Sequence, residues 1–159
     1  MKRLLIFRFE NVLINIEPDQ YLYQKAVWTL LRELKTWGYK LGLITSLGFE
    51  EFTKAATSSD LVRSTIHWSF DCLIQNYQPE HQFDELLRFA EKNEIKKEEI
   101  VYFGCHFSDL QAVQQARIDF IGVIDHLPAS ELLDIALSDD EKTHPVLLAE
   151  FLSKYLAKV

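Results

Sequence analysis

The sequence predicts a three-layer α/β fold built around a five-stranded parallel sheet, and three observations support this prediction. Short apolar runs, each long enough for a buried strand and too short for a helix, recur five times along the chain. Stretches with apolar residues at helical spacing separate these runs. Polar or charged residues follow the first four strands, at the carboxyl ends where parallel sheets bind their ligands. We therefore expect a functional site at that edge of the sheet.

The first predicted strand, Leu4–Phe7, leads directly into a break that contains two charged residues. Because side chains alternate along a strand, Arg8 and Glu10 point together to one side, while Phe9 points with Phe7 to the other. Charged side chains at the end of a buried strand are costly unless they have partners or a chemical role. This strand end is therefore the first place to look for function.

The remaining elements are expected in the following order. Ile14–Glu17 is extended, and Pro18 and Asp19 then open a helix that stops at Gly38. Further strands are predicted at 40–45, 70–75, 100–104 and 120–124, with helices at 49–57, near 61–65, from Pro79 onward, and around Leu110, Val113 and Ala116. A helix is then expected near 129–137. An acidic turn at 138–141 follows, which we interpret as a solvated helix start. The chain ends with a predicted amphipathic helix that carries Leu148, Phe151, Leu152 and Tyr155.

Length and composition indicate a single domain over residues 1–159, with 48% hydrophobic and 26% charged residues as in an ordinary globular protein. The formal net charge of -7 argues against nucleic acid or an anionic membrane as the main partner. No apolar stretch approaches the length that a bilayer requires. The two cysteines, Cys72 and Cys105, form neither a C-x-x-C pair nor a disulfide framework, so we predict a reduced, cytoplasmic setting.

The four strand ends, taken in order, resemble the motifs of the haloacid dehalogenase-like (HAD) hydrolases, which are mostly phosphatases with a Rossmann-like sheet. The family's first motif is an apolar strand that runs into D-x-D-G-x-L, and R-F-E-N-V-L at 8–13 occupies that place. Its second motif is a strand that ends in Thr or Ser, its third a Lys-Pro that opens a helix with a Phe soon after, and its fourth begins G-D-S-x-x-D. These are matched by Thr45 and Ser46, by Gln78, Pro79 and Phe83, and by the residues from Gly104 to Asp109. The resemblance covers about residues 4 to 124.

The differences from the family motifs fall on the residues that carry its chemistry. The resemblance implies that the nucleophile should stand at Arg8, but a guanidinium is always charged and cannot attack phosphorus. It implies that Glu10 takes the place of the general acid and base, with one extra methylene. The family's Lys is Gln78 here, and the acidic residue that supports Mg²⁺ is Cys105. Two family residues remain, Thr45 and Asp109.

These changes predict a degenerate site. Arg8 stands roughly where the charge of the metal would be, so we expect it to pair with Glu10 and Asp109 and to make a Mg²⁺ ion unfavourable. Arg8 is then either a buried structural ion pair, which we favour, or an anion-binding group. Thr45 and Ser46 hold a phosphate-like anion or cap the next helix. The gaps after the first and second motifs are too short for a large cap domain.

Cys105 precedes His106, which raises the question of a cysteine nucleophile. Adjacent residues at a strand end usually point apart, so we interpret Cys105 as a partly buried thiol.

We therefore predict a HAD-like phosphatase-fold protein without a catalytic residue or cofactor, which serves as a binding or interaction protein. Its partner would be an unidentified protein or a small anionic ligand, and self-association is left open. One alternative is a hydrolase that acts on a phosphate ester with an altered mechanism through Glu10 or Asp109. The other is a sensor of phosphate or a phosphorylated metabolite that uses Arg8 and Thr45.

Overall fold

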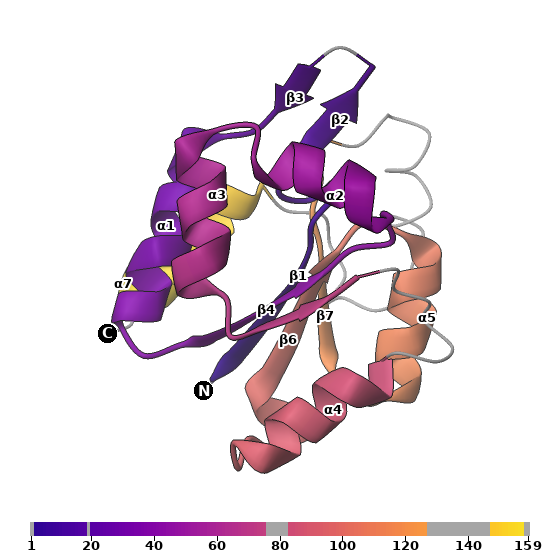
Figure 1. Cartoon of the computed structure of the whole chain (residues 1–159). Helices are drawn as coiled ribbons and strands as arrows, with labels where there is room; N and C mark the ends of the chain where they lie inside the picture. Colours follow the sequence, from indigo (N-terminus) through magenta and orange to yellow (C-terminus); the bar gives the residue numbers. More distant parts are fainter. Residues whose placement is uncertain (1, 19, 76–82, 127–146, 158–159) are drawn as a thin grey trace.

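The computed structural model describes residues 2–18, 20–75, 83–126 and 147–157, and it confirms the predicted three-layer α/β fold (Figure 1). The central sheet is entirely parallel, with the strand order β5-β4-β1-β6-β7. Its strands are β1 (Leu4–Arg8), β4 (Lys40–Ile44), β5 (Cys72–Ile74), β6 (Ile100–Gly104) and β7 (Asp119–Gly122). Each predicted strand is therefore present, and the sheet places β1 at its centre.

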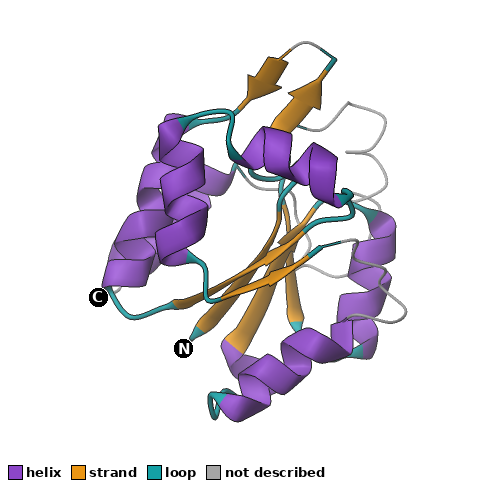
Figure 2. Ribbon diagram, viewed as in Figure 1, coloured by secondary structure: helices purple, strands orange, loops and turns teal. Residues whose placement is uncertain are grey.

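Helices cover both faces of this sheet (Figure 2). One face carries α1 (Lys25–Thr36), α3 (Asp60–Ser69) and α7 (Leu148–Ala157), and the other carries α4 (Phe83–Lys92) and α5 (Phe107–Gln115). The short helix α2 (Phe49–Ala56) lies near the carboxyl ends of the strands, and a 3₁₀ turn, η1 (Lys97–Glu99), precedes β6. Among the described segments, those between β1 and α1 and between β4 and β5 contain no large cap domain.

The two faces of β1 supply two separate cores, as the alternation of side chains in a strand requires. Leu5 and Phe7 pack in the core that includes α1, α3 and α7. Leu4 and Ile6 pack in the core that includes α4 and α5. All four side chains are fully buried. The near-continuous apolar run of this strand thus reflects a sheet covered on both faces.

The expectation that Pro18 and Asp19 open a helix is wrong. The predicted extended stretch is strand β2 (Asn15–Glu17), and it pairs antiparallel with β3 (Gln20–Leu22), so that α1 begins only at Lys25. Two residues separate the strands, a length typical of a hairpin. The cross-strand pair of Ile16 and Tyr21 combines a β-branched with an aromatic side chain, which favours pairing over helix formation.

Other boundaries shift by a few residues. Helix α3 extends beyond the predicted stretch near 61–65, and Ser59 caps its start by accepting a hydrogen bond from the amide of Val62 at 3.2 Å. The predicted final helix is present as α7. The helix predicted near 129–137, the acidic turn at 138–141, and Gln78 with Pro79 lie outside the described residues. Within the described segments, no helix is both long and apolar enough to cross a bilayer.

Candidate functional site

Four predicted site residues converge at the carboxyl end of the sheet. Arg8 is the last residue of β1, and Glu10 follows two positions later. Thr45 comes directly after β4, which pairs with β1 up to the contact of Arg8 with Ile44. Asp109 lies in the first turn of α5, just beyond β6 on the other side of β1. Neighbouring parallel strands therefore bring these side chains together.

The guanidinium of Arg8 joins the two carboxylates. Its Nη1 donates to both oxygens of Asp109, at 3.0 Å and 2.9 Å. Its Nη2 lies 2.9 Å from Oε1 of Glu10 and donates to Oγ of Ser46 at 2.7 Å. Arg8 and Glu10 are each 8% exposed, and Asp109 is fully buried. The arrangement is a buried ion-pair cluster with directed hydrogen bonds.

Glu10 has donors on both of its oxygens. Its Oε2 accepts a hydrogen bond from the hydroxyl of Thr45 at 2.6 Å, and its Oε1 accepts one from the amide of Ser46 at 2.9 Å. The same hydroxyl of Thr45 accepts from the amide of Leu47 at 3.1 Å. The N-cap of α2 is Gly48, so Thr45 and Ser46 do not cap that helix, contrary to one of our two interpretations.

Burial and charge act in opposite directions on this cluster. Burial disfavours the charged form of Arg8, but Asp109 and Glu10 outweigh it, so the pKa of Arg8 stays above its ordinary value. Burial also raises the pKa of Asp109, while the positive charge of Arg8 and the nearby His106 limit that rise. The guanidinium is therefore the fixed charge around which the carboxylates are arranged.

Tyr102 also helps to hold the pKa of Asp109 down, and sequence reasoning did not find this residue. Tyr102 lies within the apolar strand β6, where a tyrosine reads as a core residue. The signal that could have found it is its phenolic hydroxyl, because a buried tyrosine usually has a hydrogen-bond partner.

Cys105 and His106 lie next to the cluster and act on its charges. Cys105 is 2% exposed and packs in the core that includes α1 and α7, so it is more buried than the partly buried thiol we expected. His106 is the N-cap residue of α5, and its Nε2 lies 3.4 Å from Nδ2 of Asn11. Gln78 lies outside the described residues.

The loop after β1 holds Glu10 in place through an unusual backbone conformation. Asn11 has a φ of 67°, a left-handed conformation that asparagine tolerates better than most residues. Its amide donates to the carbonyl of Ile14 at 2.8 Å, which closes the turn. The family motif has a glycine at this position, and glycine and asparagine are the residues that adopt this conformation most readily.

Comparison with known proteins identifies the fold. The family model for haloacid dehalogenase-like hydrolases matches residues 7–123. A structure from Thermotoga maritima, provisionally described as a beta-phosphoglucomutase, is 16% identical with a TM-score of 0.71, and the match covers 100% of both chains. No curated protein sequence matches this chain.

Two further solved structures are 3-deoxy-D-manno-octulosonate 8-phosphate phosphatases. The protein from Moraxella catarrhalis, whose crystals contained magnesium and phosphate ions, is 18% identical with a TM-score of 0.64, over 98% of this chain and 86% of that one. The protein from Yersinia pestis is 19% identical with a TM-score of 0.65, over 98% of this chain and 81% of that one. At these identities the likeness shows the fold alone.

Proposed function

Because the chain belongs to the haloacid dehalogenase-like hydrolase family, we propose that it is a catalytically inactive member that persists as a binding or interaction protein. One observation carries the proposal. The side chain at the position of the family nucleophile is the guanidinium of Arg8, and it is bound to Glu10 and Asp109 within 3.0 Å. A group that is always protonated has no electron pair to attack phosphorus.

The residues present do not fit the Mg²⁺ ion that the family implies. Both oxygens of Asp109 accept from Nη1 of Arg8, and both oxygens of Glu10 already have donors. Magnesium needs oxygen ligands in near-octahedral geometry at roughly 2.0–2.1 Å, which would place it against the guanidinium. In the described part of the chain, no group of three or more His, Cys, Asp or Glu side chains could hold a metal ion. The proposed role therefore involves no metal.

The same contacts weigh against the two alternatives. A hydrolase that used Glu10 as its general base would need a carboxylate free to accept a proton, yet this one is held by Thr45, Ser46 and Arg8. A phosphate sensor would need unbalanced positive charge, whereas two carboxylates already face the one guanidinium. The cluster therefore offers no unbalanced positive charge to an incoming phosphate.

Hydrolysis of p-nitrophenyl phosphate by the purified full chain, with excess MgCl₂, tests the loss of activity. We expect a rate equal to that of the buffer, unchanged by Glu10→Ala. Magnesium-dependent turnover that disappears in Glu10→Ala would overturn the proposal. The triple variant Arg8→Asp, Gln78→Lys, Cys105→Asp restores the family residues and shows whether the scaffold still supports the reaction.

A thermal unfolding assay with inorganic phosphate separates the inactive protein from a sensor. A ligand that binds the folded state must raise the melting temperature, so a sensor would show a rise that grows with phosphate concentration. We expect no rise beyond that produced by sulfate at the same ionic strength. A phosphate-specific rise that Arg8→Met abolishes would favour the sensor instead.

A further inference from the structure

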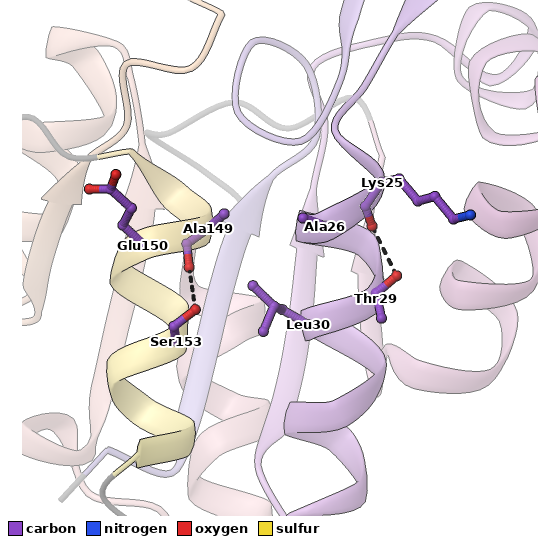
Figure 3. Close-up of a pocket in the computed structure, with 7 residues that line it drawn as sticks. All are labelled: Lys25, Ala26, Thr29, Leu30, Ala149, Glu150 and Ser153. Carbon is purple, nitrogen blue, oxygen red and sulfur yellow. Dashed lines mark hydrogen bonds between the residues drawn. The ribbon is translucent and has the colours of Figure 1, made fainter.

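An open groove of about 640 Å³ lies between α1 and α7 (Figure 3), and no residue of the Arg8 cluster lines it. Its walls are mostly apolar and built from small side chains. Ala26, Thr29 and Leu30 of α1 face Ala149 and Ser153 of α7 across it. Figure 3 shows Leu30 pointing from α1 toward α7. A groove between two helices with short side chains has the shape into which the ridge of another helix packs.

Charged side chains on the exposed side of α1, next to the groove, form a pattern that is complementary to itself. Lys25 lies four residues before Thr29 and Glu33 four residues after it, along one side of α1. All three residues are exposed, and neither Lys25 nor Glu33 forms an ion pair with any described residue. In two antiparallel helices related by a two-fold axis at Thr29, each Lys25 faces the Glu33 of the other helix. The two-fold symmetry therefore gives two ion pairs from one pattern.

The second wall of the groove fits the same arrangement. Glu150 of α7 and Ala26 of α1 both line the groove. Ala26 is three residues before Thr29 and Arg32 is three residues after it, so the two-fold axis brings Arg32 of a second copy over Ala26. Its guanidinium then approaches Glu150, which is exposed and has no ion pair with the described residues.

We propose that the groove between α1 and α7 binds a second copy of this chain, with the two α1 helices antiparallel about a two-fold axis at Thr29. Opposite charges meet at both ends of the contact, and the antiparallel helix dipoles add a small attraction. The contact is small compared with stable protein interfaces, so the dimer is weak, with a dissociation constant above about micromolar. It is independent of the state of the Arg8 cluster.

Charge reversal on α1 tests the arrangement by sedimentation velocity over a wide range of protein concentration. Lys25→Glu and Glu33→Lys each place like charges opposite one another twice, so each weakens association roughly tenfold. The double variant K25E/E33K restores opposite charges at both positions and recovers association. A chain that stays monomeric throughout overturns the proposal and leaves the groove to a helix of another protein. A dimer that neither reversal weakens, or that the double variant fails to recover, overturns the two-fold geometry.

A cysteine on the proposed axis gives a second readout with a matched control. Thr29 and Thr36 are both exposed on α1, and each hydroxyl donates to the carbonyl four residues earlier, at 3.0 Å and 3.1 Å. In the dimer, residue 29 of one copy lies opposite residue 29 of the other. Thr29→Cys therefore forms an intermolecular disulfide under mild oxidation, and Thr36→Cys does not.

The native thiols add little background to this assay. Burial raises the pKa of Cys72 to about 11, and Cys105 is buried. Equal crosslinking of the two threonine variants would overturn the proposed axis.

Discussion

Removal of the guanidinium in Arg8→Met should strongly destabilise the protein. The change leaves Asp109, which is fully buried, and Glu10, which is 8% exposed, without their cation. Opposite charges about 4 Å apart near a protein surface attract by about 4 kcal/mol, and breaking a buried pair on one side typically costs about 3–5 kcal/mol. We therefore expect the free energy of unfolding to fall by about 3–5 kcal/mol in urea titrations followed by circular dichroism.

A matched control is available on the surface. Arg63 lies 3.3 Å from Asp60, but the two side chains are 59% and 97% exposed. Arg63→Met also deletes a guanidinium, but one that is exposed to water, so the free energy of unfolding should fall by less than about 0.5 kcal/mol. If Arg8→Met were no more destabilising than Arg63→Met, the reasoning that the cluster stabilises the fold would be refuted.

The loss of stability in Arg8→Met should also depend on pH, in a direction that the pKa of Asp109 determines. Burial raises the pKa of Asp109 even in the presence of Arg8, and loss of Arg8 raises it further above the unfolded value. Between the two pKa values the folded variant binds more protons than the unfolded chain, so its stability falls as the pH rises. The difference in the free energy of unfolding between the wild type and Arg8→Met should therefore be smaller near pH 4.5 than near pH 7.5. An equal or larger difference at pH 4.5 would contradict the raised pKa of Asp109 in the variant.

Three further predictions each follow from one local feature: a backbone angle, a hydrogen bond and a raised pKa. Arg117→Gly should raise the free energy of unfolding by about 1 kcal/mol in urea titrations, because residue 117 follows α5 with a φ of 61°; no gain would mean that its left-handed conformation carries no strain. Thr45→Val should lower that free energy by about 1–3 kcal/mol, because a buried oxygen of Glu10 loses its donor, and a neutral result would argue against the hydrogen bond. Burial and the nearby Asp71 raise the pKa of Cys72 to about 11, so iodoacetamide should modify the native thiol slowly at pH 8 and about tenfold faster per pH unit above it; a rate like that of free cysteine would contradict the raised pKa.

The sequence was sufficient to predict those features that depend on local pattern. The apolar run Leu4–Phe7 predicted a buried strand, and Leu5 and Ile6 lie in different cores on its two faces. The same alternation placed Arg8 and Glu10 on one side, and their charged groups lie 2.9 Å apart. In both cases the period of the strand alone determines where the side chains point.

Features that depend on distant partners could not be predicted in this way. Proline followed by aspartate occurs at helix starts and in turns, and the pairing of Ile16 with Tyr21 decides in favour of a hairpin. The extent of α3 was underestimated because its β-branched residues, such as Val62 and Thr65, lower helix propensity, whereas burial of both side chains compensates for this. The effect of Tyr102 on Asp109 acts between two elements and leaves no local signature in the sequence.

The longer side chain of Glu10 is consistent with the proposal that a guanidinium has taken the place of a metal. Magnesium takes its oxygen ligands in near-octahedral geometry, whereas a guanidinium binds carboxylate oxygens in the plane of its donors. Both oxygens of Asp109 accept from the single nitrogen Nη1, and one oxygen of Glu10 contacts Nη2 while the other accepts from Thr45. The amide of Ser46 and the hydroxyl of Thr45 both donate to Glu10 and so help to stabilise its carboxylate. On this proposal, Arg8 removes the nucleophile and the need for a metal in a single substitution.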